Sequence, residues 1–310
     1  MELKQRTLRR ETSCVGIGLH TGKKVNMKIK PAPVNTGIIF VRKDIPGQPE
    51  IPVSFKNVAD PERATNLVYN GYKVQTVEHL LAALYGCGID NAIIEIDAPE
   101  VPAMDGSAAP FVFLIQTDAG ILVQDGFKNF LIIKKFFEFE HNDSLILAYP
   151  SKELKIEYTI EFDHPYVRNQ SYEFRFSTKR FIKEISRART FGFLHEVDAL
   201  KKKGYAKGGS LDNAVVFDKF RVLNPEGLRF EDECVRHKIL DFIGDIATLG
   251  KPVIGRFVVK RSGHCANHNM LKELMSQPDY WRILSPAVEK DISKEIKLPV
   301  FGIPEFAPVS

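Results

Sequence analysis

The chain has 310 residues and a mass of 35.1 kDa, a length that corresponds to roughly two domains. Hydrophobic residues make up 44% and charged residues 26% of it, which is typical of a soluble globular protein and excludes disorder, collagen and coiled coil as the dominant state. The net charge of +4 is a weak indication of nucleic-acid binding and a mild indication of an anionic substrate or surface.

The cysteines and the N-terminus both favour a cytoplasmic protein. The four cysteines stand far apart without a CxxC pair, so neither a disulfide framework nor a thiolate zinc site is indicated, and we expect reduced thiols. The opening segment MELKQRTLRR lacks the apolar stretch of a secretory signal, and no uncharged apolar run approaches the ~20 residues of a membrane span. We therefore expect a soluble protein whose only membrane contact would be peripheral.

The first third of the chain has the pattern of strands followed by helices. Apolar and polar residues alternate over 25–29 and again over 51–55, which predicts two half-buried strands. The period changes at 76–86, where an apolar stripe ended by glycines predicts a helix. A strand is expected over 91–97, and a second helix is expected to begin at Ser107 as its cap.

The second half repeats this order after an expected join at 120–126. Its strands are expected at 130–139, 154–162 and 253–260, and its helices at 178–187 and 232–249. Each half thus runs from strands through a helix with a histidine to another strand. We therefore predict an α+β fold of two similarly built domains that face each other, with ranges 1–122 and 127–310.

The helix predicted at 232–249 presents one polar face. His237 and Asp241 are four residues apart and so lie one turn apart on the same side, with Asp245 one turn further along and Lys238 beside them. A histidine and an aspartate at this spacing can both bind one metal ion. The alternative, a solvated face with a helical ion pair, stays open at this point.

The helix predicted at 76–86 places Glu78 next to His79. His79 shares its side of the helix with small residues, among them Ala82 and Gly86, so another element or a ligand could approach closely. The alternative is close helix packing, in which His79 is a core residue with its hydrogen bonds satisfied.

Two histidines and one aspartate, with a fourth position left open, are the donor set of a catalytic zinc site. A general base acting on water is expected at an unligated carboxylate beside a ligand, and Glu78 occupies that position. His264 follows a predicted strand in RSGH and could project into such a site, or it could be a loop histidine without a role. We assign no chemical role to His20 or His268.

Seven motifs occur in order along the chain, within a family resemblance that extends over about residues 6–285. They are GIGLHTGKKV, TVEHLLAALYG, VPAMDGSAAPF, ARTFGF, GGSLDNAVV, RHKILDFIGD and RSGH. Together they closely resemble the UDP-3-O-acyl-N-acetylglucosamine deacetylase family, the zinc enzymes of the committed step of lipid A biosynthesis in Gram-negative bacteria. The resemblance implies hydrolysis of the N-acetyl group of UDP-3-O-acyl-N-acetylglucosamine, which gives UDP-3-O-acyl-glucosamine and acetate.

The resemblance also implies how the metal centre is built. It implies zinc held by His79, His237 and Asp241, and Glu78 as the general base. Iron as Fe²⁺ could occupy the same ligands, because it also accepts nitrogen and oxygen donors.

Further roles follow from the same resemblance. It implies that His264 is the charged partner or general acid and that Asp245 orients it. Thr190, in ARTFGF, would help to polarise the acetyl carbonyl. Lys238 would meet the anionic portion of the substrate.

The family fold implies a site between the two domains and an insert in the second domain that forms an apolar passage for the acyl chain. Here the insert is expected at about 191–216. The candidate lining residues, with one from the first domain, are Phe191, Leu194, Val197, Leu211, Val216 and Leu19. For each of them the alternative is ordinary core packing.

Two other functions compete with this interpretation. A zinc amidase or peptidase acting on another substrate would cleave acetylated peptides without any need for a nucleotide. An RNA-binding module would need arginine and aromatic residues clustered on one sheet face, whereas the only run of three lysines is 201–203, at an expected helix end. We therefore expect a monomeric enzyme that acts on a small molecule and has no nucleic-acid partner.

Overall fold

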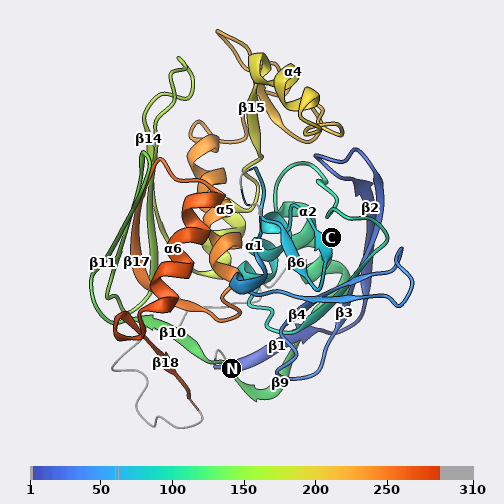
Figure 1. The fold of residues 1–310 in the computed structure, drawn as a ribbon, viewed down its shortest axis with the longest axis vertical. Helices are drawn as coiled ribbons and strands as arrows, with labels where there is room; N and C mark the ends of the chain where they lie inside the picture. The colour runs from blue at the N-terminus through green and yellow to red at the C-terminus, as the bar shows by residue number, and fades with distance from the viewer. Residues whose placement is uncertain (1–2, 60, 62, 287–310) are drawn as a thin grey trace, which may run out of the picture.

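Two β-sheets form the outer layers of the molecule, and helices fill the space between them (Figure 1). The structure is a computed structural model that describes residues 3–59, 61 and 63–286. The first half of the chain supplies one sheet, and the second half supplies the other. Each half also supplies helices to the middle layers, so helices from opposite halves meet at the centre.

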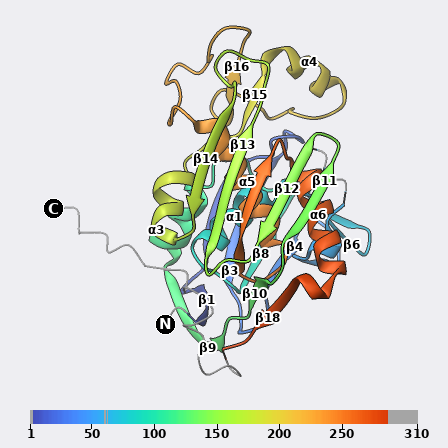
Figure 2. The same cartoon turned by 90° about the vertical axis from the view of Figure 1, so that its left-hand side faces the viewer.

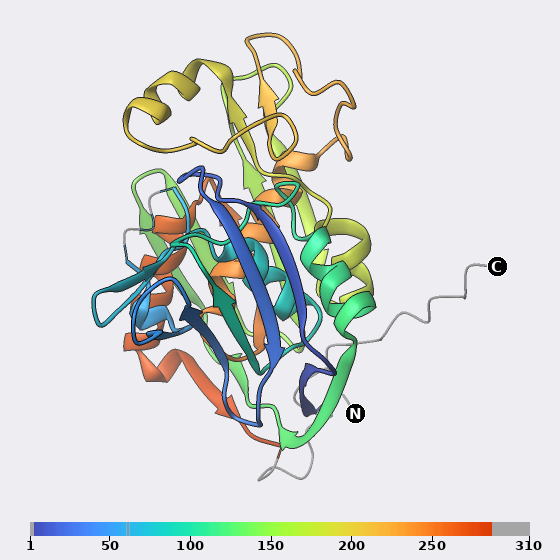
Figure 3. The ribbon, with the colours of Figure 1, turned by 90° about the vertical axis from the view of Figure 1, so that its right-hand side faces the viewer.

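The sheet of the first half has five strands (Figure 3). In sheet order they are β2 (Thr12–Ile17), β3 (Lys24–Pro31), β8 (Ala92–Ile96), β4 (Ile38–Arg42) and β5 (Glu50–Pro52). The helices of this half are α1 (Glu78–Gly86) and α2 (Ala109–Phe113), and α2 continues as a π-helical segment over Leu114–Ala119. Its shorter elements are η1 (Phe55–Asn57), β6 (Leu67–Tyr69) and β7 (Tyr72–Val74). The alternation predicted along β3 is confirmed, because Val25, Met27 and Ile29 are buried.

The sheet of the second half has seven strands (Figure 2). They are β10 (Phe130–Ile133), β11 (Phe137–His141), β12 (Ser144–Tyr149), β13 (Leu154–Ile160), β14 (Gln170–Arg175), β17 (Val253–Lys260) and β18 (Trp281–Leu284). The helices are α3 (Thr178–Arg180) with a π-helical continuation over Phe181–Ile185, α5 (Glu233–Ala247), α6 (His264–Ser276) and the short η4 (Pro278–Tyr280). The strand expected over 154–162 is confirmed as β13, which ends at Ile160 and buries Leu154, Ile156, Tyr158 and Ile160 on one face.

The two sheets share one pattern of strand pairing. β3 pairs antiparallel with β8, which pairs in parallel with β4. In the same way, β12 pairs antiparallel with β17, which pairs in parallel with β13. The helix that precedes the central strand is α1 in the first half and α5 in the second. The prediction of an α+β fold with two similarly built halves that face each other is therefore confirmed. The ranges 1–122 and 127–310 stay a prediction, and residues 287–310 lie outside the described part of the chain.

α1 and α5 contact each other at the centre of the molecule (Figure 1). Every residue of α1 except Tyr85 is buried, because α1 packs between the first sheet and the helices of the second half. At Gly244 of α5, an added Cβ would lie 2.2 Å from the backbone oxygen of Glu78. Gly244 thus permits the close approach of the two helix backbones, and the polar residues of both helices share one space.

Several predicted elements begin or end elsewhere in the structure. The join between the halves expected at 120–126 forms the strand β9 (Ile121–Phe127), which pairs antiparallel with β1 (Lys4–Leu8). The strand expected over 130–139 is interrupted between β10 and β11, which pair with different neighbours. The strand expected over 51–55 ends at Pro52, since the chain turns into η1. The helix expected from Ser107 begins at Ala109, whose N–H donates to the Ser107 hydroxyl at 3.2 Å.

The predicted insert projects from one end of the molecule (Figures 1 and 2). It contains β15 (Phe191–Phe193) and β16 (Val215–Phe217), which pair in parallel, and the helix α4 (Leu194–Lys202) between them. No helix in the described ranges combines the length and the apolar character that crossing a bilayer requires.

Candidate active site

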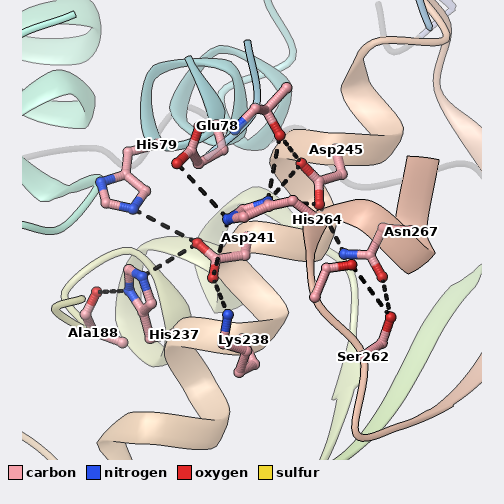
Figure 4. Close-up of polar contacts among 12 residues, drawn as sticks. Glu78, His79, Ala188, His237, Lys238, Asp241, Asp245, Ser262, His264 and Asn267 are labelled. Carbon is pink, nitrogen blue, oxygen red and sulfur yellow. Dashed lines mark hydrogen bonds and ion pairs between the residues drawn. The ribbon is translucent and has the colours of Figure 1, made fainter. Parts of the chain in front are cut away.

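His79, His237 and Asp241 lie together where α1 meets α5 (Figure 4). Nε2 of His79 lies 3.6 Å and Nε2 of His237 lies 3.2 Å from Oδ1 of Asp241. All three side chains are buried, so the polar face of α5 is not the solvated face that was the alternative for this helix. The sequence placed these residues on two separate helices, and the fold brings them into one group.

The three side chains fit the demands of a metal ion. One donor atom from each lies within 4.8 Å of the others, and bonds of about 2 Å to a tetrahedral ion place ligand atoms roughly 3.3 Å apart. Nδ1 of His237 lies 3.0 Å from the carbonyl oxygen of Ala188. Because a carbonyl only accepts, Nδ1 carries a proton and donates it, which leaves Nε2 free as a ligand. Burial lowers the pKa of His79, and its neutral imidazole is the form that binds metals.

Lys238 lies beside this group and pairs with it. Its ammonium donates to Oδ2 of Asp241 at 2.8 Å. Burial alone would raise the pKa of Asp241, but the neighbouring His237 and Lys238 outweigh burial and hold that pKa well below its usual range. Asp241 therefore remains ionised and can serve as a metal ligand through Oδ1 while Oδ2 binds Lys238.

Glu78 lies next to the group without joining it. Its side chain is buried, and burial raises the pKa of its carboxyl to about 7. Oε2 accepts a hydrogen bond from the backbone N–H of Thr65 at 3.0 Å. Oε1 lies 3.8 Å from Nε2 of His264 (Figure 4). A carboxyl group with a pKa near 7 beside a metal-ligand set is suited to accept a proton from water.

His264 is the first residue of α6, and it pairs with Asp245 of α5. Nδ1 of His264 lies 3.0 Å from Oδ2 of Asp245. Burial alone would lower the pKa of His264, but the charge and hydrogen bond of Asp245 outweigh burial and raise that pKa to about 9. The imidazole is therefore charged at neutral pH. The alternative of a loop histidine is wrong, because His264 begins a helix and its side chain is buried.

Three residues around Asp245 were missed by the sequence analysis. Asn267 donates to Oδ2 at 2.7 Å, and Thr65 donates to Oδ1 at 2.5 Å. His268, to which we assigned no role, lies 3.2 Å from Oδ1 through Nε2. His264, Asn267 and His268 have the i, i+3, i+4 spacing of one helix face, a signal that was hidden because a loop was expected there. The sequence gives no comparable spacing for Thr65, since Thr65 lies far from Asn267 and His268 along the chain.

The sequence of this chain matches a family of known proteins. A family model of UDP-3-O-acyl N-acetylglycosamine deacetylases matches residues 5–276. The chain belongs to this family. Relatives named UDP-3-O-acyl-N-acetylglucosamine deacetylase, from Saccharophagus degradans and Teredinibacter turnerae, are 51% and 48% identical over 285 residues, which are 91% of this chain and 94% of each relative. Another from Shewanella violacea is 45% identical over 298 residues, 95% of this chain and 97% of the relative.

Thr190, a candidate from the deacetylase resemblance, lies in the segment just before β15. Its backbone N–H donates to Gly106 O at 2.8 Å, and its carbonyl accepts from Val215 N–H at 2.7 Å. Ala188, two residues earlier, is the residue whose carbonyl binds His237. The segment 188–190 is thus held by hydrogen bonds to His237, Gly106 and Val215.

The insert residues expected to line an acyl passage differ in burial. Leu194 and Leu211 are exposed, which argues against ordinary core packing for these two. The others, Phe191, Val197, Val216 and Leu19, are half-buried. The ring of Phe191 lies 6.4 Å from that of His237, centroid to centroid, and Leu19 O accepts from Gly208 N–H of the insert at 3.0 Å. The insert therefore borders the metal-ligand set at one end and contacts the first half at the other.

Proposed function

We propose that this chain hydrolyses the N-acetyl group of UDP-3-O-acyl-N-acetylglucosamine, giving UDP-3-O-acyl-glucosamine and acetate, in lipid A biosynthesis. The observation that carries the proposal is the buried group of His79, His237 and Asp241 with Glu78 alongside, in a member of this deacetylase family. We infer the substrate from the names of the relatives, and the reaction type from side chains that are suited to hydrolysing an amide.

The metal ion would be zinc, held by His79, His237 and Asp241, although Fe²⁺ suits the same nitrogen and oxygen donors. When bound, the ion would make water more acidic and polarise the acetyl carbonyl. The hydrogen bond from His237 to Ala188 O and the ion pair between Lys238 and Asp241 would keep two of the ligands oriented.

Glu78 would take a proton from the attacking water through Oε1, while Oε2 stays bound to the Thr65 N–H. Negative charge then develops on the carbonyl oxygen of the acetyl group. Charged His264 and the hydroxyl of Thr190 would stabilise that charge, and one such preorganised donor is typically worth ~3–4 kcal/mol. Asp245 would keep His264 oriented and charged. The C–N bond breaks as the amine receives a proton from Glu78 or His264.

The two ends of the substrate would be bound by different surfaces. Lys238 would contact the anionic portion, in addition to its ion pair with Asp241. The insert would take the acyl chain along the surface that carries Phe191, Leu194, Val197, Leu211, Val216 and Leu19. Burying the chain there would contribute up to ~0.8 kcal/mol per methylene, so the acylated sugar should be preferred over its unacylated precursor. We further propose a cytoplasmic monomer whose membrane contact, if present, is peripheral.

The test compares three substrates with wild type and Glu78→Gln. Wild type should release acetate from UDP-3-O-acyl-N-acetylglucosamine much faster than from UDP-N-acetylglucosamine, and should not act on acetylated peptides. Glu78→Gln keeps the size of the side chain but cannot accept the proton, so its rate should fall at least ~10²-fold with the metal retained. Turnover of acetylated peptides without a nucleotide would contradict the proposed substrate, and near-normal turnover by Glu78→Gln would remove Glu78 as the base.

A further inference from the structure

Thr65 is a buried residue of the first half whose polar atoms reach both groups that the proposed chemistry needs. It lies between η1 and β6 and is fully buried. Its carbonyl accepts a hydrogen bond at 3.1 Å from the N–H of Val77, the residue before α1. Thr65 is therefore attached to the N-terminal end of α1, where Glu78 is the first helical residue.

On the α1 side, Thr65 distinguishes the two oxygens of Glu78. Its backbone N–H donates to Oε2 at 3.0 Å, while Oε1 lies 3.8 Å from Nε2 of His264. A carboxylate oxygen that accepts a hydrogen bond is a weaker base than its free neighbour, because the bond stabilises the negative charge. Thr65 thereby leaves Oε1, which faces His264, as the oxygen that can receive a proton.

On the α5 side, Thr65 binds Asp245. Its hydroxyl lies 2.5 Å from Oδ1, and the ionised carboxylate can only accept, so the single hydroxyl proton is donated to Asp245. The Thr65 oxygen also lies 3.3 Å from Nδ1 of His264 and 3.0 Å from Nε2 of His268. Because the hydroxyl proton is already used, the oxygen can only accept there, and both nitrogens must carry protons. This arrangement directs Nε2 of His264 toward Glu78.

The other donors to Asp245 do not connect the two halves. His264, Asn267 and His268 all lie on α6, in the same half as α5. Among the described residues that bond to the Asp245 carboxylate, Thr65 is the one that comes from the first half. A threonine with only a packing role would need one hydrogen-bond partner for its hydroxyl. Thr65 instead donates its N–H to the carboxylate of Glu78 and its hydroxyl to the carboxylate of Asp245.

We propose that Thr65 is a positioning residue that fixes Glu78 relative to the Asp245–His264 pair across the boundary between the two halves. The inference rests on the proposed function, because it gives Thr65 a role only if Glu78 and His264 carry out the chemistry. Glu78 and Asp245 belong to α1 and α5, so a small displacement of one helix would change the distance between base and acid. A misplacement of about 1 Å can cost on the order of 10²-fold in rate.

A matched pair of variants tests the hydroxyl. Thr65→Val keeps the branched shape and the N–H that binds Glu78 but lacks the hydroxyl, and Thr65→Ser keeps the hydroxyl. For Thr65→Val we expect kcat to fall about 10–100-fold, KM to change less than about twofold, and one zinc per chain to be retained. Thr65→Ser should keep kcat within about threefold of wild type. If Thr65→Val does not fold, Thr65→Ala takes its place, since it also lacks the hydroxyl and needs less room.

A double-mutant cycle tests whether Thr65 acts through Asp245. If it does, Thr65→Val combined with Asp245→Asn should be about as slow as Asp245→Asn alone, because the carboxylate that Thr65 orients is already gone. Three results would each overturn the role of Thr65. The fold-losses in kcat of Thr65→Val and Asp245→Asn could multiply in the double variant, Thr65→Val could keep the kcat of wild type, or Thr65→Val and Thr65→Ser could lose kcat equally. A wild-type chain that releases no acetate from UDP-3-O-acyl-N-acetylglucosamine would instead overturn the proposed function, before any variant is compared.

Discussion

Glu78 and His264 are the two ionisable side chains on which the proposed chemistry depends, and both are buried. Burial raises the pKa of Glu78 to about 7. Asp245 raises the pKa of His264 to about 9 although burial opposes it. Between these two values Glu78 is ionised and His264 is charged, which are the forms that a base and an acid require. A bound cation would lower both values, because positive charge favours deprotonation.

The pH dependence of kcat/KM follows from these two groups. The rate should rise with pH as Glu78 loses its proton near or below pH 7, and fall again as His264 loses its proton toward pH 9. Asp245→Asn removes the charge that raises the pKa of His264. In that variant we expect the basic limb of the profile to move down by about one unit or more. A basic limb that stays in place would show that His264 is not the group that titrates there.

Site residues could be predicted from the residue pattern only where they lie close together along the chain. His237 and Asp241 are one helical turn apart, and Glu78 adjoins His79, so each pair could be recognised before the fold was known. The bond from Thr65 to Asp245 joins residues 180 positions apart, and no local pattern encodes it. The tautomer of His237 depends on Ala188 O, a backbone atom that any residue at position 188 would supply.

At the scale of the elements, the site depends on the close approach of α1 and α5. The Cβ of Gly244→Ala would lie 2.2 Å from the backbone oxygen of Glu78, so the helices would have to separate. Alanine is the better helix former by about 1 kcal/mol, but overpacking against backbone costs about 1–3 kcal/mol and occasionally more. We expect Gly244→Ala to lower the free energy of unfolding in urea and to weaken zinc binding in competition with a chelator, because His79 and His237 lie on opposite helices.

Gly192→Ala is the matched control for this prediction. A Cβ at Gly192 would have nothing within 4 Å, so this variant should keep the stability and zinc affinity of wild type. If Gly244→Ala bound zinc as tightly as Gly192→Ala does, the separation of α1 and α5 would not limit the metal site.

Elements were predictable where one face is buried and the other exposed. The alternation along β3 and β13 has this origin, and both strands agree with the structure. β10 is different, because all four of its residues are buried. Lys134 and Lys135 separate its apolar run from that of β11, and both are exposed where the chain passes between the two strands. We did not use them as a break and expected one strand over 130–139. The start of α6 at His264 was also missed, since its first turn has no side-chain cap in the structure.

At the scale of the whole molecule, the two halves share one sheet topology and place the candidate site where their helices meet. The first half contributes Glu78, His79 and Thr65, and the second contributes His237, Asp241, Asp245 and His264. The order of strands and helices along the sequence was enough to predict two similar halves. The side chains that meet between the halves depend on how α1 packs against α5, which required the structure.

The most direct test of the account measures metal and activity together in the purified chain. Wild type should contain one zinc per chain, lose deacetylation of UDP-3-O-acyl-N-acetylglucosamine on chelation, and recover it when zinc is added back. His237→Ala should neither hold zinc tightly nor recover activity. Full activity after the metal has been removed, or one tightly bound zinc per chain in His237→Ala, would contradict the assignment of His79, His237 and Asp241 as the ligands of a catalytic metal.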